Sequence, residues 1–494
     1  MNAYQKLKKQ FSDISLVEDI SSILSWDQAT IMPKSSAQQR GAQMGLLNRI
    51  QHQMLTHPDI KYWMEEALND DTLSSEDKVN IFEMKRHWIH TTSVPEQLSE
   101  KLTMATTVGQ IKWEEALHNN SFDDFSPYLE NILEVSIEAA HYKGEKLECS
   151  SYDACLDSFE AGITVREVDK IFNDLELFIP DFLQKVIKKQ ENNPLPPKNL
   201  SFDIEKQKKL GTQIIKAIGF DFSKGRVDTS THPFCGGTPY DIRITSRFDS
   251  KNFISGLMAM VHEAGHALYD FGLPEKWQGQ PAGQARGMSI HESQSLLIEM
   301  QMARSEAFLK FLHPQLLSTF GLSEAEWSFN HLKNLYYQVT PGFIRVDADE
   351  VTYPLHVILR YNIEKKLFDR TLKVRDIPHF WNEYMAKTLN IEPSNDKEGA
   401  LQDIHWSCGA FGYFPCYTLG ALTAAQLYEA FKQEHRNAEQ NISCGEFSSL
   451  VGWLRKNVHQ KASLLSRDEL LTKATGQPLC ASFFKKHLQT RYLT

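Results

Sequence analysis

The chain has 494 residues, a length that allows about three domains at roughly 150 residues each. Hydrophobic residues make up 41% of it and charged residues 23%, which is typical of a globular protein and excludes a disordered or collagen-like chain. The net charge is −10, from 53 basic and 63 acidic residues. That balance, without a long basic run, argues against a nucleic-acid partner.

Membrane insertion and export are not expected either. No apolar run is long enough to cross a bilayer, and Ser and Asp interrupt the apolar positions of residues 1–25. Seven cysteines, thinly scattered, are expected to be reduced thiols. The sequence therefore predicts a cytoplasmic protein with no membrane partner.

Helix dominates the first part of the chain. Apolar residues recur three or four positions apart in residues 1–180, for example at Leu47, Ile50 and Met54. Residues 188–200 contain three closely spaced prolines and cannot continue a helix, so they form a linker or a long surface loop. We expect a helical N-terminal part, residues 1–190, and a catalytic part, residues 200–494, with interleaved lobes.

Residues 226–247 have a different pattern. Gly236-Gly237 is a turn signal, and Ile242 and Ile244 alternate with polar residues. This pattern predicts a hairpin of half-buried strands. The chain is therefore expected to be mainly α, with a small antiparallel sheet beside the helix that follows.

That helix carries a metal-binding pattern. Asp249 or Ser250 can cap it, and His262 and His266 lie one turn apart with Glu263 beside the first. His-Glu-x-x-His supplies two zinc ligands and a carboxylate that activates water. The alternative is an ordinary helix with two hydrogen-bonded histidines and a surface glutamate.

A catalytic zinc ion needs a third protein ligand and an open position. Glu292 follows His266 by 26 residues and is the predicted third ligand. Alternatively, Ser289 caps a second helix and Glu292 completes its capping box. Glu299 and Glu306 are fallback ligands. We expect one ion per chain, zinc by preference, although cobalt or manganese would also suit these ligands.

Further motifs occur in order along most of the chain. They read Ser25-Trp26-Asp27, His232-Pro233-Phe234, Asp241-x-Arg243-x-Thr245, His262-Glu263-Ala264-Gly265-His266, His291-Glu292-Ser293-Gln294, Ile344-Arg345-x-x-Ala348-Asp349, Gly399-x-x-Gln402-Asp403-x-His405-Trp406 and Gly412-Tyr413-Phe414-Pro415. Together they resemble the thermostable (Taq-type) carboxypeptidase family of metallopeptidases. The resemblance implies a mainly α, two-lobed helical metallopeptidase with a deep central groove, found as a homodimer. It also implies metal-dependent removal of C-terminal residues from peptides, with broad specificity and poor release next to proline.

The resemblance also suggests further site residues. Tyr413, from the Gly-Tyr-Phe-Pro match, is the first choice to stabilise the oxyanion, and His405 is the second. Packing in a glycine-rich corner is the alternative for Tyr413. Arg345 offers a planar donor for the substrate carboxylate, unless it forms a structural ion pair with Asp347 or Asp349.

Two residues of the strand region are candidate substrate contacts. His232 could bind the substrate backbone, since strand edges suit extended peptides. Arg243 could also bind substrate, but it lies beside Asp241 and a structural role is its main alternative.

Two other functions fit the same residues. An oligoendopeptidase or dipeptidase would share the metal chemistry and differ in how it holds the peptide end. A non-catalytic, zinc-stabilised peptide-binding scaffold would tend to close its metal with a fourth ligand, often Cys. Residues 262–292 contain no Cys, which counts against the scaffold.

Overall fold

The computed structural model describes residues 1–197 and 200–494, and the chain forms two compact units. The first unit consists of Met1–Thr91, Pro194–Tyr337 and Gly420–Leu479, and the second of Thr92–Asn193, Gln338–Leu419 and Cys480–Thr494. The chain passes from the second unit back to the first at Asn193–Pro194, inside the predicted linker 188–200. Residues 198–199 of this linker lie outside the described residues. The division into parts 1–190 and 200–494 stays a prediction.

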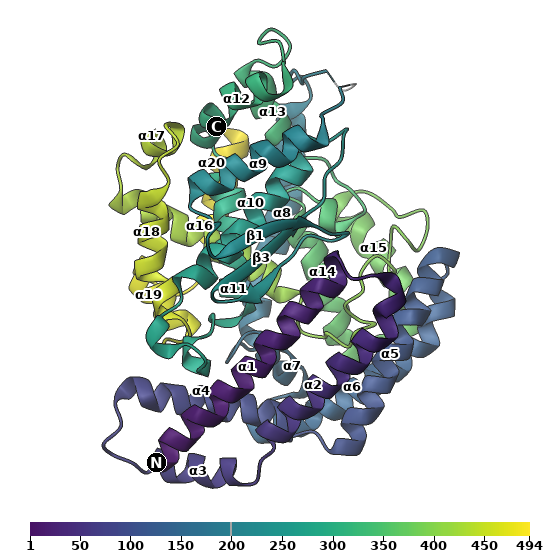
Figure 1. Ribbon diagram of the computed structural model, residues 1–494. Helices are drawn as coiled ribbons and strands as arrows, with labels where there is room; N and C mark the ends of the chain where they lie inside the picture. The colour runs from purple at the N-terminus through teal and green to yellow at the C-terminus, as the bar shows by residue number, and fades with distance from the viewer. Residues whose placement is uncertain (198–199) are drawn as a thin grey trace. The chain divides into compact units, whose positions relative to one another are not determined.

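The first unit is helical, with one sheet (Figure 1). Its helices are α1 (Ala3–Thr30), α2 (Ala37–Leu55), α3 (Asp59–Leu68), α4 (Ser75–Thr92), α9 (Ile204–Ile218), α10 (Phe253–Gly272), α11 (Gly287–Leu296), α12 (Glu306–Phe320), α13 (Phe329–Tyr336), most of α16 (Pro415–Glu434), α17 (Ala438–Ser443), α18 (Ser448–Asn457) and α19 (Arg467–Thr475). Short helical turns are η1 (Lys34–Ser36), η2 (Glu275–Trp277), η3 (Pro281–Gly283), η4 (Leu297–Met302) and η7 (His459–Lys461).

The described elements of the second unit are helical. They are α5 (Glu96–Asn119), α6 (Phe122–Leu147), α7 (Ser151–Phe159), α8 (Val165–Gln190), η5 (Arg345–Asp347), α14 (Tyr353–Phe368), η6 (Val374–Asp376), α15 (Ile377–Leu389) and α20 (Ala481–Leu493). The prediction of a mainly α fold is confirmed.

The sheet has the strand order β1-β3-β2 and is mixed. Strands β2 (Cys235–Thr238) and β3 (Asp241–Ser246) form the predicted antiparallel hairpin. Strand β1 (Gly225–Thr229) runs parallel to β3, so the prediction of a purely antiparallel sheet is wrong. The hairpin pattern could not reveal β1, because a parallel partner needs a crossover rather than a tight turn.

The predicted position of the hairpin turn is also wrong. The turn lies at residues 239–240, and Gly236-Gly237 are inside β2. Gly237 has φ +100°, and a Cβ on it would lie 2.1 Å from the carbonyl oxygen of Asp241. The glycine therefore permits a close approach of β2 to β3. Ile242 and Ile244 are buried, as their alternation predicts.

Helix α10 packs against β3, α9 and α11 (Figure 1). It begins later than predicted, because Asp249 and Asn252 still pair as an extended bridge. Asn252 is the N-cap, and its side chain accepts a hydrogen bond from the Ser255 amide at 3.2 Å. The predicted caps Asp249 and Ser250 are therefore wrong.

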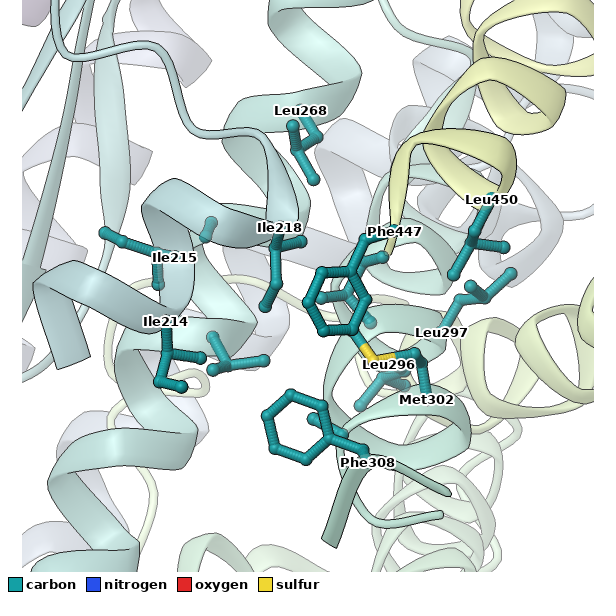
Figure 2. Close-up of a cluster of buried hydrophobic side chains, with 14 of the residues drawn as sticks. Ile214, Ile215, Ile218, Leu268, Leu296, Leu297, Met302, Phe308, Phe447 and Leu450 are labelled. Carbon is teal, nitrogen blue, oxygen red and sulfur yellow. The ribbon is translucent and has the colours of Figure 1, made fainter. Parts of the chain in front are cut away.

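A buried apolar cluster holds these helices together. Figure 2 shows part of this cluster, including Ile214, Ile215, Ile218, Leu268, Leu296, Leu297, Met302, Phe308, Phe447 and Leu450. Full burial of such a side chain contributes about 1.5–3 kcal/mol. The buried face of α10 is thus fixed from several elements at once, which sets the direction of its polar face.

Two predictions concern the chain as a whole: that it has no membrane-spanning segment and that its cysteines are reduced. Among residues 1–197 and 200–494, no helix combines the length and hydropathy required to cross a membrane. None of the seven cysteines, all within the described residues, forms a disulfide bond.

Candidate metal centre and active site

The three predicted metal ligands converge in the first unit. The rings of His262 and His266 on α10 have centroids 5.0 Å apart. Glu292 Oε2, from α11, lies 3.6 Å from His266 Nε2. One potential ligand atom from each residue falls within 4.8 Å of the other two. The fold therefore brings these three side chains together from two helices.

This arrangement fits a divalent metal ion. Two ligands at tetrahedral zinc, each about 2 Å from the ion, are roughly 3.4 Å apart, close to the 3.6 Å between His266 Nε2 and Glu292 Oε2. Two imidazoles and a carboxylate suit zinc, cobalt or manganese. The three side chains keep 13–22% of their surface exposed, so the site is accessible.

Glu292 does not cap its own helix. Arg286 is the N-cap of α11 and offers no side-chain capping bond, while Ser289 lies fully buried within the helix. The alternative in which Ser289 and Glu292 form a capping box is therefore wrong.

Glu299, a fallback ligand, contacts a predicted ligand instead. It lies in the π-helical turn η4, and its Oε2 is 3.0 Å from His262 Nδ1. Arg304 Nη2 donates to Glu299 Oε1 at 3.3 Å. A carboxylate on the far nitrogen of a ligand histidine fixes its ring orientation and makes it a stronger ligand. The other fallback, Glu306, is half-exposed and pairs with two lysines.

The electrostatics of the site favour a cation. Burial alone would lower the pKa of His262, but the hydrogen bond to Glu299 and the charges of Glu292 and Glu263 raise it to about 10. Burial, with smaller effects from neighbouring histidines, holds the pKa of His266 well below its usual value, so its imidazole is neutral. Burial also raises the pKa of Glu263 to about 7, a value suited to a general base near neutral pH.

Two other residues of the His-Glu-Ser-Gln motif, His291 and Gln294, connect α11 to neighbouring elements. The His291 ring stacks on the ring of His266, with centroids 4.5 Å apart. Gln294 Oε1 lies 3.1 Å from His459 Nε2, and both side chains are buried. These contacts tie α11 to α10 and to η7.

Arg345 belongs to the second unit and is buried, with 5% of its surface exposed. Its Nε and Nη2 donate to Asp403 Oδ1 at 3.0 and 2.7 Å, and its Nη1 donates to the Tyr353 hydroxyl at 2.8 Å. The ion-pair partner is thus Asp403, and the alternatives Asp347 and Asp349 are wrong.

A second arginine shares the same aspartate. Arg360 is fully buried, and its Nε donates to Asp403 Oδ2 at 2.5 Å. Burial would raise the pKa of Asp403, but Arg360 and Arg345 hold it well below its usual range. Two guanidinium groups on one carboxylate leave a positive charge at this arginine cluster, which we define as Arg345, Arg360 and Asp403.

His405 and Tyr413 lie together, also in the second unit. Their ring centroids are 5.5 Å apart, and His405 Nε2 is 3.3 Å from the Tyr417 hydroxyl. Tyr413 packs edge-on against Phe159 at 5.0 Å. Tyr413 therefore makes a packing contact, as its alternative role predicts. The catalytic roles of Tyr413 and His405 stay predictions.

A buried carboxylate that the sequence motifs did not indicate supports this segment. Glu364 on α14 accepts hydrogen bonds from the Tyr152 hydroxyl, Trp406 Nε1 and the Gly412 amide at 2.7, 2.9 and 2.7 Å. It therefore anchors the residue directly before Tyr413. No local pattern signals such a group, since its donors come from two stretches far from it in sequence, one with Tyr152 and one with Trp406 and Gly412.

The strand residues are in the first unit. His232 is exposed between β1 and β2, where its carbonyl accepts from the Ser230 hydroxyl at 2.6 Å. Arg243 pairs with Asp241 at 2.5 Å and its guanidinium lies 4.4 Å from the centre of the Trp26 ring. These contacts support a structural role for Arg243, and substrate binding by either residue stays a prediction.

Comparison with known proteins agrees with the geometry. Residues 6–492 match the family described as carboxypeptidase Taq (M32) metallopeptidase. Thermostable carboxypeptidase 1 of Thermus thermophilus is 32% identical over 99% of this chain and 98% of its own length. Trypanosoma cruzi metallocarboxypeptidase 1 superposes with a TM-score of 0.97 at 36% identity, over 100% of this chain and 99% of its own. An M32 carboxypeptidase from Deinococcus radiodurans superposes with a TM-score of 0.95 at 31% identity, over 99% and 98%. The chain therefore belongs to the carboxypeptidase Taq (M32) family of metallopeptidases.

Proposed function

We propose that the protein is a metal-dependent carboxypeptidase that removes C-terminal residues from peptides with broad specificity, except next to proline. The observation that carries this proposal is the convergence of His262, His266 and Glu292, with Glu263 beside them. The names of the relatives support the direction of cleavage. The specificity and a homodimeric state rest on the family resemblance, and a cytoplasmic location rests on the seven thinly scattered cysteines, which are expected to be reduced.

In this proposal His262, His266 and Glu292 hold one divalent ion, with zinc as the first choice and cobalt or manganese as alternatives. When bound, such an ion polarises the peptide carbonyl and lowers the pKa of water. Glu263 takes the proton of the attacking water and passes it to the leaving amine. The raised pKa of its buried carboxyl, about 7, suits both transfers.

Further residues are proposed to stabilise the oxyanion and to bind the peptide. Tyr413, or His405 in its place, donates a hydrogen bond to the developing oxyanion, which is typically worth about 3 kcal/mol. Arg345 holds the substrate carboxylate, a role that the positive charge of the arginine cluster supports. His232 and Arg243 are proposed to contact the rest of the peptide.

Mass spectrometry of peptide digests tests the function directly. One peptide is digested with its free C-terminus and with a C-terminal amide, each with and without a chelator. We expect stepwise loss from the free C-terminus alone, and no loss when the metal is removed. Equal cleavage of both peptides would overturn the proposal in favour of an oligoendopeptidase, and activity that survives complete metal removal would overturn the metal dependence.

A further inference from the structure

Helix α16 approaches the proposed ligand Glu292 very closely at Gly420, within the first unit. A Cβ atom on Gly420 would lie 2.8 Å from Glu292 Cγ, 2.9 Å from Glu292 Cβ and 3.2 Å from the carbonyl oxygen of Ser289. Carbon atoms in good contact are about 3.5–4.0 Å apart. The two crowded atoms of Glu292 are next to its backbone, so moving the carboxylate end alone would not relieve the clash.

Helix α11 has little freedom to retreat from α16. Its C-terminal end packs on Gly265 of α10, where a Cβ would lie 2.5 Å from Ser295 Cα. At its N-terminal end, Arg286 donates to Glu83 at 2.5 Å, with both side chains buried. Because both ends are held, a methyl group on residue 420 would displace the side chain of Glu292.

Local preference does not explain a glycine at this position. Gly420 lies inside α16 (Pro415–Glu434), where alanine is the better helix former. We propose that Gly420 is a positioning residue for Glu292: the missing side chain lets the stem of Glu292 lie directly on α16, which keeps its carboxylate 3.6 Å from His266 Nε2. This inference rests on the proposed function, in which Glu292 is a metal ligand.

The test measures Zn²⁺ affinity by competition with a chromophoric chelator, on the full chain stripped of metal. We expect Gly420→Ala to weaken Zn²⁺ binding by roughly ten-fold or more, as for other groups that orient a ligand. The matched control is Gly452→Ala, because Gly452 lies in α18 of the same unit with nothing within 4 Å of its Cβ position. The control is expected to bind Zn²⁺ as the wild type does.

A double-mutant cycle separates positioning from general stability. If Gly420 acts through Glu292, then Gly420→Ala combined with Glu292→Gln should bind Zn²⁺ no more weakly than Glu292→Gln alone. Additive losses would overturn the proposal. So would wild-type affinity of Gly420→Ala, or a metal-free Gly420→Ala protein that is unfolded by circular dichroism, since either result removes the specific link to Glu292.

Failure of the proposed function would look different. Wild-type Zn²⁺ affinity in Glu292→Gln would show that Glu292 is not a ligand, and the inference would be overturned together with that role. Loss of affinity in Glu292→Gln but not in Gly420→Ala would overturn the inference alone.

Discussion

The two units each contain a buried cluster of charged groups, and the clusters have opposite excess charge. In the first unit, Glu263, Glu292 and Glu299 surround two histidines, and the pKa of His262 is raised to about 10. In the second, Arg345 and Arg360 share the single carboxylate of Asp403. There the pKa of His405 is lowered to about 4, chiefly by burial and further by the two arginines.

This difference has a simple chemical meaning. Buried charges are costly unless they are paired, so each cluster favours a partner of opposite sign. The first cluster suits a divalent cation, and the excess positive charge of the second supports the proposed binding of a peptide carboxylate by Arg345. A metallocarboxypeptidase needs both kinds of site.

The largest expected effect concerns the carboxylate that we assign as the base. Glu263→Gln removes the proton acceptor but leaves the proposed ligands, so we expect full metal content and a kcat lower by roughly 10²- to 10⁴-fold. Glu275→Gln, at an exposed glutamate of the same unit, is the control. Metal content and turnover are measured on the same preparations. Unchanged turnover with bound metal would mean that Glu263 is not the base.

The next effect tests the arginine cluster. Asp403→Asn leaves two buried guanidinium groups without their shared counter-ion, and breaking such a pair typically costs about 3–5 kcal/mol. We expect a matching loss in the free energy of unfolding, measured by denaturant titration. Asp376→Asn, at an exposed aspartate of the same unit, should change it little. Equal stability of the two variants would show that another group balances the arginines.

The pH dependence of stability tests Glu364. Burial, its largest influence, raises the pKa of this carboxyl from 4.5 to about 7 in spite of three hydrogen bonds. Because the folded pKa is raised, the stabilising contribution is complete below about pH 4.5 and is lost as the pH rises through 7. Glu364→Gln cannot titrate, so its Tm relative to wild type should rise between pH 5 and pH 8. A constant difference in Tm would contradict the raised pKa.

The smallest expected effect concerns Glu299, whose carboxylate contacts the proposed metal ligand His262. Glu299→Gln removes the negative charge of the carboxylate that contacts His262 Nδ1. We expect Zn²⁺ affinity to fall by about 10- to 100-fold. Glu306→Gln is the control, because Glu306 is half-exposed and pairs with lysines. Affinity is measured by chelator competition. An equal fall in both variants would point to a general loss of negative charge.

The metal motif was predictable because its geometry is local. His262 and His266 are one helical turn apart, and any helix over these residues places both on one face. The alternation of Ile242 and Ile244 predicted buried strand positions for the same reason. By contrast, the parallel strand β1 depends on pairing with another stretch of the chain, and the sequence pattern did not indicate it.

The sequence by itself determined the helical character of the chain, the pair of histidines with their glutamate, and the residue types able to complete a metal site. Only the tertiary structure decided that Glu292 reaches His266, that Glu299 bonds His262, and that Asp403 pairs with Arg345. The physical reason is the separation in sequence. Hydrophobic periodicity relates only residues that are one helical turn or one strand step apart. The distance between side chains on different helices depends on how those helices pack, down to the missing side chain of Gly420.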